Sequence, residues 1–429
     1  MEDNILKKWI KLDNAATIYP ATLSRKYAGM FRMSALISEN IDKEILNKAL
    51  SRVIKRFPMY RYQLKQGLFW HYFKLNDTTP IIQDDYKNPL LRINFKDNSN
   101  FMFRVRVFNR KISVEYFHSL TDGTGGITFL LTLVGEYLRI KHKINISYND
   151  IVLNPKDKPS KMEIEDSFLK YCRDYGVSFK EKTAYHQKGT IEETYILNII
   201  TGKISIDKIK EKAKYYNCSI TQFIVSLMID SFQTIQDNEI KNPKKRKPIK
   251  ISVPVNLRNI YKSKTLRNFS SYINIGINPK YGHFYFDEIV NEVKNSMNLM
   301  LSEKRLNAKI TENVKLSKNI FVRLIPMILK KHILSIGEKL YGDRYVTSTM
   351  SNLGLVNIPD ELTEYIKDLG FIIGRSRNKP GSGSCIGYNG NLYITFSRKI
   401  KETEFEKLFF RKLVEMDIPV EIESNEGGN

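Results

Sequence analysis

His118-Ser119-Leu120-Thr121-Asp122-Gly123 (HSLTDG) is the most informative stretch of this chain. It follows a segment in which Ile112, Val114 and Tyr116 alternate with other residues, the period of a half-buried strand. Apolar residues with helical spacing begin near Thr124. The pattern therefore predicts a strand, a sharp turn and a helix, with the histidine at the end of the strand.

The chemistry of His118 suggests a general base, because the ordinary pKa of histidine lies close to neutral pH. The strand alternation puts His118 on the apolar side, where partial burial would keep the ring neutral. Asp122 and Gly123 can hold the bend that aims the ring. A structural alternative stays open: a core histidine at a strand end, followed by an aspartate that caps the next helix.

Size and composition indicate an ordinary globular protein. With 429 residues, 42% of them hydrophobic and 27% charged, the chain can form two domains or one two-lobed body. Its best apolar stretch, 123–135, is too short to span a bilayer, and the N-terminus shows no secretory signal. We therefore expect a cytoplasmic protein with no transmembrane segment. Cys172, Cys218 and Cys385 are widely spaced, so we interpret them as structural thiols and expect no metal site.

The net charge of +23 is spread along the chain, with one true cluster at 241–250. Two prolines make this cluster an exposed loop, for which a solvated surface is the simpler interpretation. The alternative is that Lys244, Lys245 and Arg246 guide the phosphates of a polyanionic cosubstrate. The chain lacks zinc-finger spacing and an aromatic-basic RNA-binding signature, so no nucleic-acid partner is expected.

The rest of the chain divides into two halves of mixed strand and helix. The polar, proline-containing stretch that starts at Asn154 predicts a connection between an N-terminal lobe, 1–175, and a C-terminal lobe, 176–429. The apolar patterns predict the following elements: strands at 31–37, 69–72, 251–255, 273–277 and 346–351, a helix after Asp42, a capped helix after Ser219, a hairpin at Asn389-Gly390 and a final helix at 402–414.

The segment 320–334 is both apolar and basic. It could lie on a membrane surface, but a helix packed in the core is the favoured interpretation.

The HSLTDG stretch, at the end of a strand about a quarter of the way along a two-part α/β chain, resembles the HxxxDG motif of the chloramphenicol-acetyltransferase-like superfamily. Four further segments look like its alcohol-acetyltransferase-like branch: KLDNAATIYP (11–20), KRFP (55–58), VPVNLR (253–258) and SNLG (351–354). Two departures matter. Phe117 replaces the second histidine that condensation domains usually carry, and the Asp-Phe-Gly-Trp-Gly motif of the plant-type enzymes is absent.

The resemblance implies two similar lobes, each a mixed sheet with flanking helices, and an active-site tunnel between them. It implies that His118 is the general base for transfer of an acyl group, acetyl or short-chain, from acyl-CoA to an alcohol or amine. Asp122 would be structural and paired with Arg258, and Gly123 would allow the tight backbone. Ser351 and Asn352 are candidate oxyanion donors, or else turn residues at a strand end. Acyl-CoA would be a cosubstrate, with no permanently bound cofactor.

Two alternatives remain open at this stage. The acyl donor could be a carrier protein, or the chain could be a non-catalytic binding or scaffold protein with the same fold. The acceptor could be an alcohol, a sugar, a lipid or an amine. A two-lobed chain can form the whole site by itself, so we expect a monomer.

Overall fold

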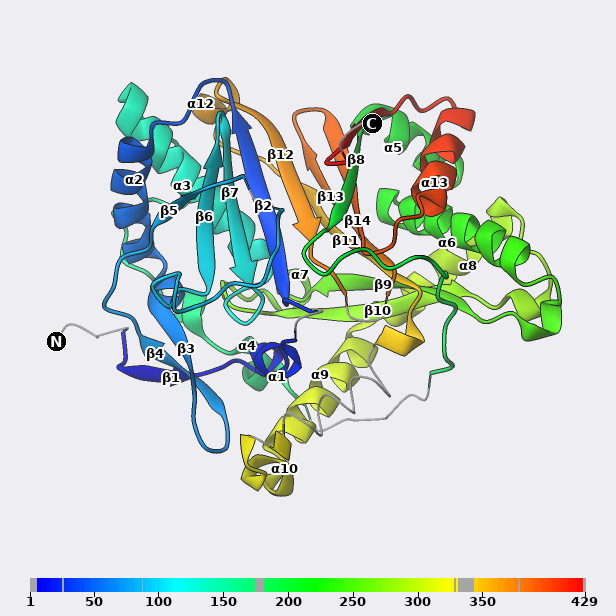
Figure 1. The fold of residues 1–429 in the computed structure, drawn as a ribbon, viewed down its shortest axis with the longest axis horizontal. Coiled ribbons are helices and arrows are strands. Elements are labelled where there is room, and N and C mark those ends of the chain that lie inside the picture. Colours follow the sequence, from blue (N-terminus) through cyan, green and yellow to red (C-terminus); the bar gives the residue numbers. More distant parts are fainter. Residues whose placement is uncertain are drawn as a thin grey trace.

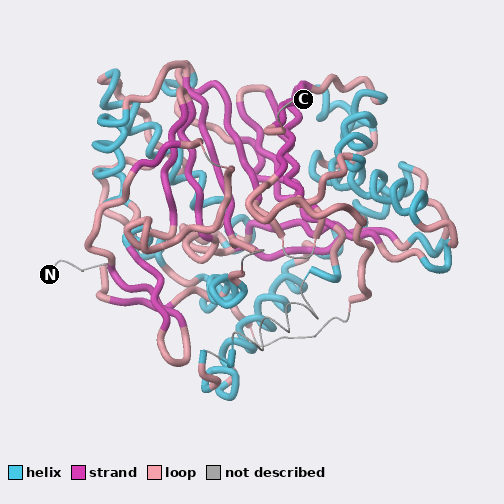
Figure 2. Tube along the Cα trace, viewed as in Figure 1, coloured by secondary structure: helices cyan, strands magenta, loops and turns pink. Residues whose placement is uncertain are grey.

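Two lobes of mixed sheet and helix lie side by side and meet in the middle of the molecule (Figure 1). Helices lie to the outside of the strands in both lobes (Figure 2). The computed structural model describes residues 6–24, 27–86, 88–173, 181–327, 329–330, 343–376 and 379–426. The mixed α/β fold with two lobes, predicted from the sequence, is confirmed.

The N-terminal lobe is built on a five-stranded sheet in the order β12-β2-β7-β6-β5. β6 and β7 form a hairpin, and the turn between them places Asn109 in the left-handed region (φ 49°). Alternating apolar side chains of β2 and β7 face two helices, α2 and α3, across a common core. The bounds are β2 Met30–Ile37, β5 Ile82–Asp84, β6 Phe103–Phe108, β7 Lys111–Phe117, β12 Ile366–Ile373, α2 Lys43–Arg56 and α3 Gly123–His142.

The C-terminal lobe contains a seven-stranded sheet in the order β10-β9-β11-β13-β14-β8-β15. The predicted capping box of Ser219 and Gln222 opens α6, whose side chains fill the second core. The elements are β8 Asn198–Ser205, β9 Ile249–Asn256, β10 Ser270–Ile277, β11 Ser348–Leu355, β13 Gly381–Tyr388, β14 Asn391–Arg398, β15 Glu421–Ser424, α5 Ile206–Tyr215, α6 Ile220–Glu239, α8 Phe286–Met300 and α13 Glu404–Glu415.

A third, small sheet packs at the edge of the N-terminal lobe in the order β1-β4-β3. Its strands are β1 Trp9–Lys11, β3 Tyr62–Gln66 and β4 His71–Leu75. The predicted strand at 69–72 is therefore wrong at its start. Phe69 and Trp70 belong to the turn between β3 and β4, because the Gly67 N–H bonds the Trp70 carbonyl (2.8 Å) and reverses the chain there.

One strand crosses between the halves of the chain. β12 follows the C-terminal β11 in sequence, yet it pairs antiparallel with β2 of the N-terminal lobe, with Leu369 opposite Ala35. A strand that the sequence division assigns to residues 176–429 therefore forms the edge of the N-terminal sheet.

Further α-helices are α1 Ile18–Thr22, α4 Ser167–Tyr171, α7 Arg258–Tyr261, α9 Glu303–Lys318, α10 Ile320–Leu324 and α12 Asp360–Thr363. Of the predicted segment 320–334, residues 328 and 331–334 lie outside the described residues. Within the described part, no single helix is long and apolar enough to cross a membrane. The bent pair α5 and α6, at 79°, passes that test by length and composition only, and most of α6 is buried in the core.

Candidate active site

His118 follows the last residue of β7, and aromatic contacts fix its ring. Its backbone N–H donates to the Gly29 carbonyl (2.8 Å). The imidazole stacks on Tyr19, with ring centroids 4.7 Å apart and planes 3° from parallel. The Phe31 ring contacts it at 4.7 Å and 53°. Rings from α1 and β2 therefore hold the imidazole in one orientation.

The environment of the His118 ring keeps it neutral. Burial lowers the pKa of His118 below its ordinary value of 6.5, and this exceeds the opposing effects of the Asp122 charge and the Asn268 side chain. Nδ1 is buried and has no hydrogen-bond partner among the described residues, while the residue as a whole keeps partial exposure.

Asp122 has both of the roles considered from the sequence. Its carboxylate caps α3 by accepting hydrogen bonds from the N–H groups of Thr124 and Gly125. It also accepts two from Arg258, Nη1 to Oδ2 at 2.9 Å and Nη2 to Oδ1 at 3.1 Å, and one from the Phe269 N–H at 2.8 Å. Both side chains of the ion pair are less than a tenth exposed. The carboxylate is thus directed at the C-terminal lobe.

Arg258 is held by the backbone that surrounds it. Its Nε donates to the Thr265 carbonyl (2.7 Å), and Nη2 donates to the Arg267 carbonyl. The guanidinium therefore connects α7 and the 265–269 segment to the start of α3. Arg258 and Asp122 are 136 residues apart in the chain.

Further contacts between the lobes surround the same motif. The Thr121 hydroxyl donates to the Leu266 carbonyl (2.7 Å), and the Asn256 amide donates to the Thr124 hydroxyl (3.2 Å). The HSLTDG turn is therefore a joint between the lobes as well as the carrier of the histidine.

The glycines of this turn are required by close packing. Gly123, Gly125 and Gly126 are absent from the residues with positive φ, so the close approach of neighbouring atoms is what requires glycine here. A Cβ on Gly123 would come within 2.6 Å of the Leu353 Cδ2, the end of a flexible side chain. A Cβ on Gly125 would lie 2.3 Å from the Leu266 backbone oxygen.

The two glycines should therefore respond differently to alanine. We expect Gly125→Ala to lower the free energy of unfolding by about 1–3 kcal/mol or more, because backbone cannot move aside cheaply. Gly123→Ala should cost less, because Leu353 can rotate and alanine gains about 1 kcal/mol in helix propensity. Urea denaturation of both variants checks this, and equal losses would contradict the packing described here.

Ser351 and Asn352 lie on β11 and point to opposite sides. Asn352 uses its amide within the C-terminal lobe, donating to the Thr221 hydroxyl (2.8 Å) and accepting from the Gly354 N–H (2.7 Å). Ser351 pairs in register with Ser384 of β13, whose hydroxyl donates to the Phe371 carbonyl of β12 (2.6 Å). Partners in a ladder share a face, so Ser351 lies on the side of the N-terminal lobe.

Four residues that the sequence reasoning did not assign to the site lie around the motif. They are Tyr19 and Asn268, which act on the His118 ring, and the ion pair of Asp13 and Arg267. Asp13 is fully buried, pairs with Arg267 (3.3 Å) and accepts from the Ala16 N–H (2.7 Å). Burial raises the pKa of Asp13 to about 6, with Arg267 opposing. The stretch 11–20, which is too apolar for a free tail, is the signal that could have found Asp13 and Tyr19, whereas no pattern marks Arg267 and Asn268.

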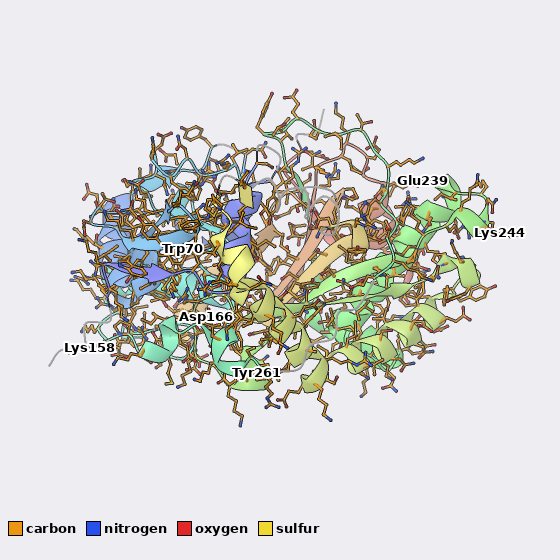
Figure 3. All side chains as sticks on the ribbon, turned by 90° about the horizontal axis from the view of Figure 1, so that it is seen from below. Trp70, Lys158, Asp166, Glu239, Lys244 and Tyr261 are labelled. Carbon is orange, nitrogen blue, oxygen red and sulfur yellow. The ribbon has the colours of Figure 1, made fainter. Side chains whose placement is uncertain are left out.

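The basic cluster is not brought to His118. Lys244 lies at the outer end of the C-terminal lobe, far from Asp166, whose carboxylate accepts from the Asn14 N–H beside this site (Figure 3). Lys244 and Lys245 are exposed, and Arg246 pairs with Asp237 (2.8 Å). Across the described ranges, no group of three or more His, Cys, Asp and Glu residues is arranged to hold a metal ion.

Comparison with known proteins finds matches in structure alone. The sequence matches no protein-family model and no curated protein. TRI101 from F. graminearum, solved with ethyl coenzyme A, is 11% identical, with a TM-score of 0.63 over 96% of this chain and 99% of that one. This chain has the chloramphenicol-acetyltransferase-like fold.

Two other solved structures agree with this. The trichothecene 15-O-acetyltransferase TRI3 from Fusarium sporotrichioides is 11% identical, with a TM-score of 0.59 over 95% of this chain and 94% of that one. The wax ester synthase/diacylglycerol acyltransferase from Marinobacter aquaeolei VT8 is also 11% identical, with a TM-score of 0.56 over 95% and 98%. The acyltransferase-like fold therefore extends over nearly the full length of the chain.

Proposed function

We propose that this protein is an acyltransferase that moves an acyl group from acyl-CoA to an alcohol or amine, with His118 as the general base. The observation that carries the proposal is a neutral imidazole that stacks on Tyr19 where the lobes meet. It lies beside the structural ion pair of Asp122 and Arg258. Two structural neighbours support the choice of donor: the trichothecene 15-O-acetyltransferase TRI3, and TRI101 solved with ethyl coenzyme A.

In the proposed reaction, Nε2 of His118 takes the proton of the acceptor hydroxyl or amine. The acceptor oxygen or nitrogen then attacks the thioester carbonyl carbon and forms a tetrahedral oxyanion. Collapse of this intermediate breaks the C–S bond, and the proton passes from His118 to the departing CoA sulfur. The histidine therefore ends the cycle neutral, as it began.

The oxyanion needs a hydrogen-bond donor, and we assign this role to the Ser351 hydroxyl. Ser351 lies on the face of β11 turned to the N-terminal lobe, whereas Asn352 is engaged with Thr221 and Gly354. Asn352 then shapes the strand end and does not touch the substrate. The Lys244–Arg246 cluster has no part in this proposal, since it lies away from the joint.

The test is release of free CoA thiol from a panel of acyl-CoAs, from acetyl to long-chain, with mixed alcohol and amine acceptors. Turnover that depends on both donor and acceptor supports the proposal and ranks the donors. A parallel arm presents the same acyl groups on a carrier protein. Turnover from the carrier alone would overturn the CoA assignment, and no turnover in either arm would favour a binding role.

The pH dependence follows from the lowered pKa of His118. The base is active when neutral, which is above its pKa, so kcat/KM should be flat from pH 7 to 8. It should fall only on the acid side, with an apparent pKa below 6.5. A rate profile with its acid limb centred above pH 7 would contradict a desolvated His118 as the base.

A further inference from the structure

The outer face of the small β1-β4-β3 sheet carries aromatic and basic side chains. In this antiparallel ladder Trp9 and Gln63 lie opposite Lys74, while Lys11 and Lys65 lie opposite Tyr72. Opposed residues share a face. The outer face therefore displays Trp9, Lys11, Gln63, Lys65, Tyr72 and Lys74. The other face, including Ile10, Leu64 and Phe73, packs on the core of the N-terminal lobe.

The turn of the same hairpin is apolar and exposed. Leu68 is 71% exposed and Trp70 is 54% exposed, and Trp9 on the neighbouring strand is 55% exposed. The chain has two tryptophans, and both lie on this surface. Tryptophan combines an apolar ring with a polar N–H, which suits the boundary between lipid and water.

The residues that follow α10 (Ile320–Leu324) contact this turn. The Met327 N–H donates to the Leu68 carbonyl, and the Lys330 ammonium donates to the Phe69 carbonyl, both at 2.8 Å. Figures 1 and 3 place α10 beside the hairpin, with Trp70 next to it on the face seen from below. Ile320 and Leu324, four residues apart and hence on one side of the helix, are both more than half exposed.

The charge of this surface has one sign. The segments that form it, 6–11, 62–75 and 320–330, contain no aspartate or glutamate. They contain these basic residues: Lys7, Lys8, Lys11, Lys65, Lys74, Arg323 and Lys330. We call the outer face of β1-β4-β3, the 67–70 turn and the exposed side of α10 the basic-aromatic surface.

We propose that the basic-aromatic surface docks on a lipid bilayer that carries anionic headgroups. Leu68, Trp70 and the α10 side chains would enter the boundary between headgroups and acyl chains, while the lysines neutralise the headgroups. A nucleic-acid backbone would use the lysines but gain nothing from exposed leucine and isoleucine. A second copy of the chain would bring like charges together. This inference is independent of the proposed acyl transfer.

The test is flotation of the purified full-length protein with phosphatidylcholine vesicles, with and without 30% phosphatidylserine. We expect binding to the anionic vesicles that weakens at 0.5 M salt, because screening removes the attraction of the lysines. Tryptophan emission should shift to the blue, since Trp9 and Trp70 are the two tryptophans present. The double variant Leu68→Ser/Trp70→Ser should bind the anionic vesicles at least about tenfold more weakly than the wild type.

The matched control is Tyr215→Ser/Tyr281→Ser, two aromatic residues about four-fifths exposed on the C-terminal lobe. It should bind like the wild type. Lys65→Gln should weaken binding to anionic vesicles about fivefold, with no effect on neutral ones. The proposal is overturned if wild type and Leu68→Ser/Trp70→Ser bind vesicles equally, or if neither binds. It is also overturned if RNA binds and vesicles do not, or if sedimentation shows a dimer that the double variant dissociates.

Discussion

Replacing His118 with alanine should lower the rate of acyl transfer about 10²- to 10⁴-fold, the usual loss when a positioned base is removed. The fold should persist, because the ring stacks on Tyr19 and contacts Phe31 but makes no hydrogen bond from its buried Nδ1. The measurement is thiol release at saturating acyl-CoA and acceptor, with the thermal midpoint of unfolding recorded on the same preparation.

His283→Ala is the matched control. This histidine is about half exposed and pairs with Asp237 on the C-terminal lobe. We expect wild-type turnover from it. If His118→Ala and His283→Ala retain equal rates, His118 is not the base, and the aromatic clamp would then be a packing feature of the joint.

Arg258→Met should lower the free energy of unfolding by about 3–5 kcal/mol, because it leaves the Asp122 carboxylate buried without its counter-ion. Urea denaturation measures this loss. The exposed pair Lys43–Asp84 offers a control, since both side chains are half exposed or more. Lys43→Met should change the stability by no more than about 1 kcal/mol.

The double variant Asp122→Asn/Arg258→Met distinguishes the contribution of the Asp122–Arg258 ion pair to stability from the contribution of Asp122 as the cap of α3. Asparagine can still cap α3, so the double variant should recover part of the loss seen with Arg258→Met alone. A coupling energy of about 0.5–3 kcal/mol is expected for residues in contact. Strictly additive losses from the two single variants would show that the ion pair does not carry the stability of the joint.

Local patterns in the sequence were sufficient for most elements of the two lobes. The β6–β7 hairpin, α3 and the Ser219 cap depend on residues within one or two turns of each other, so period and capping chemistry reveal them. The same reliance on local pattern started the predicted strand at 69–72 two residues too early, since β4 begins at His71. Phe69 and Trp70 have strand-forming side chains, but the turn is set by a backbone bond to Gly67.

The site was less accessible from sequence alone. His118 and Asp122 are neighbours in the chain, whereas Arg258 was assigned through the resemblance to a family, and the structure places it on Asp122. Asp13 and Arg267 meet across 254 residues, and no periodic pattern encodes such a pair. The two candidate oxyanion donors, Ser351 and Asn352, cannot both face the same site, because adjacent residues on a strand point to opposite sides.

The position of β12 has a consequence for synthesis on the ribosome. β2 lies near the N-terminus, and its partner at 366–373 is translated more than 300 residues later. Until then one edge of the N-terminal sheet has no partner strand, and an unpaired edge can join a neighbouring chain. Arg258 is likewise translated 136 residues after Asp122, so their ion pair forms late in synthesis. The nascent protein therefore passes through a long stage at which its first lobe is exposed to aggregation, and assistance by a chaperone should matter most before residue 373 emerges.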